Sequence, residues 1–218
     1  MKTFKKLALT LLVLFMLVPT FAFAQEVEET PELKAKIQNI VNTMPEDDAI
    51  EAIENLFGEN DRPHFATRSA SNFAIYRAED DKKKDELSMA NDAFKGDAKI
   101  YKEDGDVVIE LTTTPIYFMG RQADVTEVTV IGKSGEKFVA ANKDLKDPIT
   151  RYHKEVIQVP GRVVISIPET EIKGGEYGYN SLLDVEFKTN LRDDFAIGFG
   201  KLFPDKMVNP KARLVFNK

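Results

Sequence analysis

The chain has 218 residues, a formal net charge of −6 and no cysteine. This acidic balance argues against a nucleic-acid partner, because phosphate binding needs clustered lysine and arginine side chains. The lack of cysteine excludes disulfides and thiolate chemistry.

The first 24 residues have the pattern of a secretory signal peptide. Lys2, Lys5 and Lys6 precede the apolar run LALTLLVLFMLV, and Ala22-Phe23-Ala24 matches an A-x-A cleavage site. The apolar run has 12 residues and is too short for an ordinary membrane span, and an uncleaved N-terminal anchor is the alternative. We therefore predict an exported chain without a membrane span in its mature part, secreted or loosely associated with the cell surface.

Residues 25 to 60 are predicted to form two short amphipathic helices. Thr30 suits an N-cap and Pro31 the first helical position, and apolar residues then recur at helical spacing. A second helix is expected to begin near Pro45 and to end at a C-cap on Gly58. Helices this short bury little apolar surface alone. We expect a spacer or stalk, with packing on the next domain or on a partner as alternatives.

Residues 61 to 72 are predicted to be a polar linker, and residues 73 to 218 one all-β domain. In this domain the hydrophobic period changes to two, and glycine turns follow Asp104 and Ser134. Short strands at this spacing favour an antiparallel sandwich or barrel. About eight strands are expected, at 73–78, 98–103, 107–113, 125–132, 136–142, 162–168, 181–189 and 212–217.

Residues suited to catalysis are scarce. The chain has two histidines, His64 in the linker and His153 in TRYHKE, and they do not have zinc-ligand spacing. No glycine-rich phosphate loop follows a predicted strand. The acidic run EDDKKKDE (79–86) is typical of a solvated loop rather than of a carboxylate pair for acid–base catalysis. We therefore predict a binding protein and not an enzyme.

One segment resembles the first third of a NEAT (near-iron-transporter) domain, namely IYRAEDDKKKDELSMANDAFKGDAKIYKEDGDVVIEL. In that family a variable loop, a serine-containing 3₁₀ helix, a strand and a glycine turn follow the first strand. The matching parts here are Ser88-Met89, Ala93-Phe94, Gly96, Ala98-Lys99-Ile100 and Asp104-Gly105. A second segment, RVVISIPETEIKGGEYGYNSLLDVEF, is similar to the family's sixth and seventh strands.

The resemblance covers about residues 71 to 217 and implies an immunoglobulin-like antiparallel β-sandwich preceded by the short helical hairpin. It also implies an exported protein that captures haem or a haem-carrying protein for iron acquisition. Its expected partners are haem, a haemoglobin-like host protein and other surface haem-transfer proteins. The alternative is a surface adhesion or protein-interaction module that uses the same loops without haem.

The resemblance implies cofactor-binding residues, and three arrangements for the iron ligand stay open. The family's Tyr-x-x-x-Tyr motif on the last strand is absent here, and the nearest tyrosines are Tyr177 and Tyr179. The family's preference for tyrosine favours these two. In the second arrangement, similar to the streptococcal surface haem protein, Met207 pairs with Met89 as thioether ligands. In the third, no haem is bound.

Two further residues and two aromatic segments belong to the expected site. Ser88 is expected to donate to a haem propionate, and Phe94 is counted among the cofactor-binding residues. The connection 190–211 carries phenylalanines that either form a lid on a flat ligand or cover the open end of the sandwich, and the second interpretation is favoured. The segment TTTPIYFMGRQ (112–122) is predicted to be a strand broken at Pro115, with its loop end in the core or at the ligand rim.

Overall fold

The structure is a computed structural model that describes residues 28–56, 72–82, 84–118, 121–146, 149–150, 156–173, 182–195 and 198–216. The predicted signal peptide, the C-cap at Gly58, both histidines and both candidate tyrosines lie outside these residues. No helix in the described ranges combines the length and the apolar character needed to cross a membrane.

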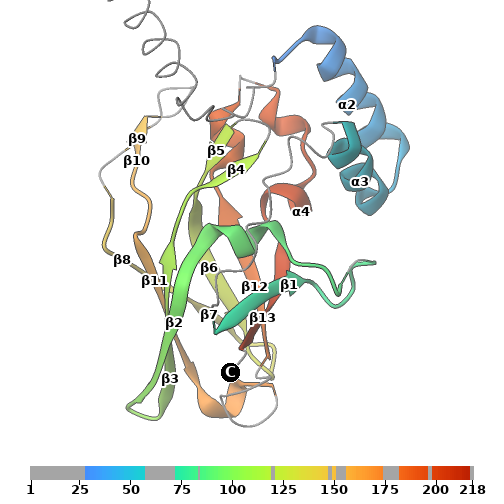
Figure 1. Cartoon of the computed structure of the whole chain (residues 1–218). Coiled ribbons are helices and arrows are strands. Elements are labelled where there is room, and N and C mark those ends of the chain that lie inside the picture. Colours follow the sequence, from blue (N-terminus) through green and yellow to red (C-terminus); the bar gives the residue numbers. More distant parts are fainter. Residues whose placement is uncertain are drawn as a thin grey trace, which may run out of the picture.

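Two antiparallel sheets face each other around the core (Figure 1). The first has the order β1 (Phe73–Arg77), β13 (Lys211–Phe216), β12 (Leu182–Thr189), β6 (Val125–Ile131) and β7 (Lys137–Val139). The second has the order β2 (Phe94–Glu103), β3 (Asp106–Thr113), β11 (Arg162–Pro168) and β8 (Ala141–Lys143). Two small hairpins are β4 (Ile116–Phe118) with β5 (Arg121–Ala123), and β9 (Ile149–Thr150) with β10 (Val156–Ile157). The predicted antiparallel β-sandwich is confirmed.

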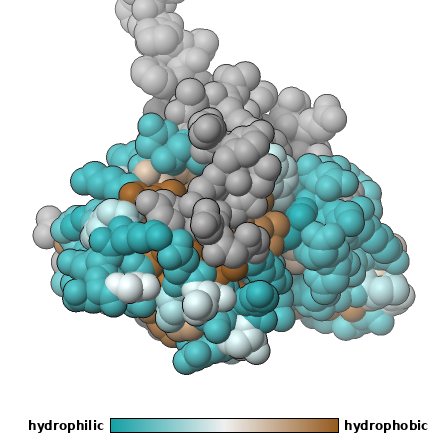
Figure 2. Space-filling model, turned by 90° about the horizontal axis from the view of Figure 1, so that it is seen from below, coloured by the Kyte–Doolittle hydropathy of each residue, from teal (hydrophilic) through white to brown (hydrophobic). Residues whose placement is uncertain are grey.

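Strand β11 shows how the sequence builds this core. Its alternate residues Val163, Ile165 and Ile167 are fully buried, because successive side chains of a strand point to opposite faces of the sheet. Ile165 lies opposite the buried Ile109 of β3 in the register of the two strands. On the face of the molecule shown in Figure 2, hydrophilic residues dominate and hydrophobic residues gather near the middle.

The short helices lie mainly at one end of the sandwich (Figure 1). Thr30 is the N-cap of the first, and its Oγ1 accepts from the Leu33 N–H at 3.1 Å, as the sequence predicts. The helices are α2 (Pro31–Thr43), α3 (Glu46–Leu56), η1 (Met89–Ala93), η2 (Glu169–Glu171), η3 (Leu191–Asp194), η4 (Gly200–Leu202) and α4 (Asp205–Val208).

Two predicted segments differ from the structure in detail. The single strand expected at 136–142 is divided at the buried Ala140, before which β7 pairs with β6 and after which β8 pairs with β11. Alternation of side chains continues through such a crossing, so the hydrophobic pattern does not reveal that the strand changes sheets. The loop end expected after Pro115 is instead the β4–β5 hairpin.

The expectation that residues 25 to 60 are a spacer is wrong for the part that the structure describes. Residues 28–56, named here the helical hairpin, pack against the end of the sandwich (Figure 1). Ile37 of α2 and Ile53 of α3 are both 0 % exposed and belong to the same hydrophobic cluster as the strands. The apolar stripes of the two helices are narrow, but the sandwich offers them an apolar surface.

Removal of a buried side chain tests this docking. We expect Ile53→Ala to destabilise the docked helical hairpin by about 2–5 kcal/mol, because it leaves a cavity at a fully buried site. The measurement is denaturant unfolding followed by circular dichroism in the helical region. Val139→Ala is the control, since Val139 is 64 % exposed and its loss is expected to change stability by less than about 0.5 kcal/mol. An Ile53→Ala curve identical to that of the unmodified chain would restore the spacer interpretation.

Candidate functional site

A cleft of about 120 Å³ lies where the helical hairpin meets the sandwich. Its walls come from α3, from the end of β1 with the loop that follows, from Ser88 and η1, and from α4 with the start of β13. Ser88, Met89 and Met207 all line it. Three of the six residues that the sequence analysis assigned to the site therefore share one cleft, although they come from two distant segments of the chain.

Ser88 has a structural task at the edge of this cleft. It is the N-cap of η1, where its Oγ accepts from the Ala90 N–H at 3.3 Å. Its backbone N–H donates to the Ile75 carbonyl of β1 at 2.9 Å, and the residue is 4 % exposed. The cap uses the hydroxyl as an acceptor, so its hydrogen can rotate toward a group in the cleft.

Met89 and Met207 line a second, smaller cavity as well. This cavity has a volume of about 20 Å³ and lies between η1, the β4 strand, the starts of β6 and η3, the end of β12 and α4. Met89 is partly buried and Met207 is buried. The two thioethers therefore lie at the boundary of both spaces, and a flexible methionine is well suited to an irregular wall of this kind.

The phenylalanines of the connection 190–211 are part of the core. Phe195, Phe199 and Phe203 are all buried, and the ring centroids of Phe195 and Phe203 are 4.9 Å apart. Phe118 of β4 meets Phe203 edge to face at 6.1 Å. The long connection thus covers the open end of the sandwich, which agrees with the favoured interpretation. In place of a simple hairpin loop it contains η3, η4 and α4.

Phe94 does not reach either cavity, contrary to its place among the expected cofactor-binding residues. It is buried, and its ring lies 5.9 Å from that of Phe187. Because β2 begins at Phe94, its side chain follows the inward alternation of the strand and enters the core. Tyr177 and Tyr179 lie outside the described residues, and their role as iron ligands stays a prediction.

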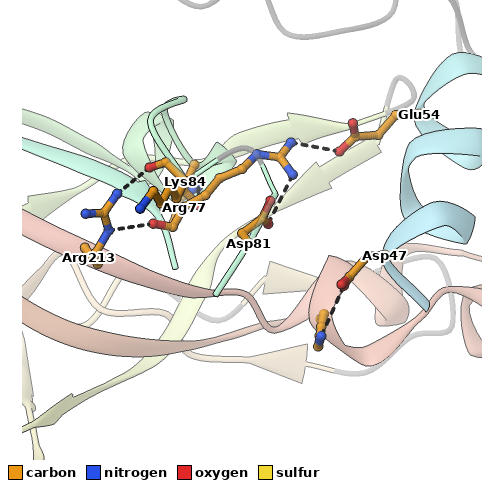
Figure 3. A network of polar contacts seen from close by, with 9 residues as sticks. Asp47, Glu54, Arg77, Asp81, Lys84 and Arg213 are labelled. Carbon is orange, nitrogen blue, oxygen red and sulfur yellow. Dashed lines mark hydrogen bonds and ion pairs between the residues drawn. The ribbon is translucent and has the colours of Figure 1, made fainter. Parts of the chain in front are cut away.

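Charged residues at the cleft are a feature that sequence reasoning missed. Arg77, at the end of β1, donates from Nη2 to Glu54 Oε1 of α3 at 3.3 Å and pairs through Nη1 with Asp81 at 3.5 Å (Figure 3). Arg213 of β13 donates to the Arg77 carbonyl at 3.0 Å. The local sequence pattern does not predict this network, because its residues are brought together only by strand pairing and by docking of α3.

Lys206 of α4 is the second cation at the cleft. Its ammonium lies 3.1 Å from Asp47 Oδ1 of α3, and the hydrogen bond to Asp47 raises the pKa of Lys206. Lys206 therefore stays charged at neutral pH. With Arg77 and with Lys211, which pairs with Glu186 at 3.4 Å, it gives the cleft three positively charged lining residues.

Asp92 is the acidic residue among those that line the smaller cavity. It belongs to η1, and its Oδ2 is buried without a hydrogen-bond partner among the described residues. Burial raises the pKa of this carboxyl. Sequence reasoning missed it as well, since one acid in a polar segment gives no sign of burial.

In the described part of the chain, no group of three or more His, Asp or Glu side chains is arranged to hold a metal ion. Comparisons with protein-family models, with curated proteins and with solved structures give no match for this chain.

The raised pKa of Asp92 leads to a pH-dependent prediction. The folded chain binds this proton more tightly than the unfolded chain does, so the ionised carboxylate lowers stability above its folded pKa. Asp92→Asn is therefore expected to raise the melting temperature at pH 7. The gain should disappear as the pH falls toward 3.8, the ordinary pKa of aspartate.

Thermal unfolding of both chains across this pH range measures the effect. Asp85→Asn is the matched control, because Asp85 lies exposed in the loop before η1. A gain for Asp92→Asn that does not depend on pH would contradict the role of its charge.

Proposed function

We propose that this chain is an exported, NEAT-like binding protein that takes up haem, or a protein that carries haem, at the cleft beside η1 and α4. The observation that carries the proposal is the meeting of Ser88, Met89 and Met207 in that one cleft. The β-sandwich agrees with the fold that the resemblance implies. Iron acquisition is the process in which a protein of this kind acts.

The side chains at the cleft suit the chemistry of haem. Thioethers are soft, neutral donors that favour ferrous iron, and Met89 with Met207 would supply two of them. The Ser88 hydroxyl is a donor for a propionate. Arg77 and Lys206 are the cations that would pair with propionate charge, and charge-assisted hydrogen bonds of this type are strong.

The room in the cleft does not suit haem in the docked arrangement. Its volume is about 120 Å³, whereas pockets for drug-sized ligands are about 300–1,000 Å³. The donor set and the volume therefore disagree. Uptake of a flat macrocycle at this place requires one wall of the cleft to move.

A protein-interaction module without haem is the second candidate, and a specific observation favours it. Tyr117 of β4 lines the smaller cavity but is 55 % exposed. Tyrosine is enriched at protein interfaces, and Tyr117 lies at the same rim as Met89. A partner that contacts this rim needs no enlarged cleft.

Haemin titration distinguishes the two candidates and the ligand arrangements. If the proposal is right, the chain gains a Soret band, and at a hundredfold excess over the dissociation constant its stability rises by about 2.7 kcal/mol. Met207→Ala and Met89→Ala are each expected to remove a six-coordinate low-spin spectrum, and Tyr177→Phe to leave it unchanged. Bleaching by Tyr177→Phe alone would instead identify a phenolate ligand. Absence of both the band and the stability gain would favour the interaction module.

Ser88 provides a separate test of the rim. Loss of a hydrogen bond to a charged propionate corresponds to about 1.5–3 kcal/mol, so Ser88→Ala is expected to weaken haemin binding about ten- to a hundredfold. Ser88→Thr is the control, because threonine keeps both the hydroxyl and the capping oxygen. Thermal unfolding of both variants separates the loss of the cap from the loss of the ligand contact. Unchanged affinity in Ser88→Ala would remove this residue from the site.

A further inference from the structure

The side chains at the cleft suit haem, but the volume of the cleft is too small for it. This disagreement directs attention to α3, the wall of the cleft that does not belong to the sandwich. We propose that the helical hairpin is an autoinhibitory cover, which closes the cleft of Ser88, Met89 and Met207 when docked and admits ligand only when it undocks. The inference rests on the proposed function, since it assigns the cleft to ligand binding.

The geometry of the cleft assigns this role to α3. Asp47, Ile50 and Glu54 of α3 line the cleft, and all its other lining residues belong to the sandwich and its connections. Ile50 is the apolar member of this wall and, like Met89, is partly buried against the core. Removal of α3 alone would therefore open the side of the cleft that it closes and leave the rest of the cleft in place.

Opposite charges hold the cover in place. Among the described residues, the helical hairpin supplies the carboxylate and the sandwich with its connections supplies the cation in five ion pairs. These pairs are Glu29–Arg121 at 3.0 Å, Glu54–Arg77 at 3.3 Å, Asp47–Lys206 at 3.1 Å, Glu46–Lys206 at 3.8 Å and Asp48–Lys82 at 2.6 Å. Arg77 and Lys206 also line the cleft. The acids of the hairpin thus occupy two of the three cations that line the cleft and would otherwise face an anionic ligand group, whereas the third, Lys211, pairs with Glu186 of β12.

The ion pairs differ in their exposure to solvent. Glu29–Arg121 and Glu54–Arg77 are largely buried, whereas the three pairs that involve Lys206 and Lys82 are exposed. Exposed pairs are weak and are screened by salt. The ionic attachment of the helical hairpin to the sandwich is therefore expected to weaken as ionic strength rises. The two buried pairs are expected to contribute most of this attachment.

The apolar contacts of the cover are few compared with those of the sandwich. The fully buried side chains that it contributes are Ile37, Ala49 and Ile53, and Leu33, Ile40, Val41 and Ile50 are partly buried against the core. Helices of 13 and 11 residues are marginal in water without tertiary packing, so the hairpin is expected to undock and unfold as one local unit. Elements with few buried contacts open with a smaller free energy than the core does. The fold therefore contains a two-state element over its cleft.

Ligand binding to such a protein depends on the fraction of open molecules. A ligand that enters only the open state binds with its intrinsic affinity reduced by that fraction. If weaker ion pairs raise the population of open molecules tenfold, the apparent dissociation constant should therefore fall about tenfold, as long as the closed state stays dominant. The same change should raise the accessibility of the cleft tenfold in the absence of any ligand.

The absence of cysteine from the chain allows a direct measurement of opening. In the full chain Ser88→Cys introduces a single thiol at the cleft, and its rate of reaction with a maleimide reports how often the cleft is open. We expect Glu29→Gln with Glu54→Gln to accelerate this reaction at least about tenfold, because loss of one partner from a largely buried pair exceeds the 1.4 kcal/mol that a factor of ten requires. Glu169→Gln is the matched control, since Glu169 pairs with Lys102 of β2 and does not contact the hairpin.

Salt gives the second arm of this experiment. The Ser88→Cys reaction is expected to be faster at about 1 M than at about 0.1 M salt, where the Debye lengths are about 3 Å and about 10 Å. Ala140→Cys serves as a reporter of global unfolding, because Ala140 is buried between β7 and β8 and does not line the cleft. Its reaction should change with neither salt nor the two substitutions. The proposal would be overturned if the Ser88→Cys rate responded neither to salt nor to the two substitutions. It would also be overturned if that rate changed only in parallel with the Ala140→Cys rate.

Hydrogen exchange on the unsubstituted chain provides an independent measurement. Amides of α2 and α3 are expected to exchange faster than those of β3 and β11, and faster still at high salt. Exchange of all four elements at one common rate would show that the hairpin is a fixed part of the fold. Haemin binding separates this proposal from the proposed function: accelerated labelling without a Soret band in any variant supports the cover and contradicts haem uptake.

Discussion

The open end of the β-sandwich is the constraint on which the distinctive parts of this chain depend. Strands that run past the last layer of the core leave apolar side chains facing water unless other segments cover them. Here two segments do so. The connection between β12 and β13 places Phe195, Phe199 and Phe203 over this end, and the helical hairpin adds Ile37 and Ile53 from outside. The cleft lies where these two segments meet the end of β1, the loop that follows it and η1.

The β12–β13 connection and the helical hairpin differ in how they are attached to the sandwich. The connection is tied to the sheet at both ends by β12 and β13, and its aromatic rings pack on one another and on Phe118. The helical hairpin is held by ion pairs in addition to a small set of buried apolar side chains. This difference in attachment is the physical basis for the proposed regulation of binding.

Ser88 shows how folding and proposed binding use the same residue. Its hydroxyl oxygen caps η1, and its backbone joins that helix to β1. The cap fixes the direction in which η1 begins beside β1, and Met89, the next residue, is thereby placed at the cleft. The Ser-Met pair is thus first a structural device. Its position at the cleft is what makes a ligand contact possible, and the proposed haem site depends on that local geometry.

The sequence by itself determined the antiparallel sandwich, the capped first helix and the positions of most long strands, because alternation, turn glycines and capping residues act over a few neighbours. The resemblance of their segment to a NEAT domain is what singles out Ser88 and Met89 as candidates. Only the tertiary structure decided that Met207 shares their cleft, that Phe94 lies in the core and that the helical hairpin is docked. Those outcomes depend on which surfaces meet. The pairing of Glu54 with Arg77 or of Asp47 with Lys206 joins residues distant in the chain, and a pattern read along one chain contains no information on such distances.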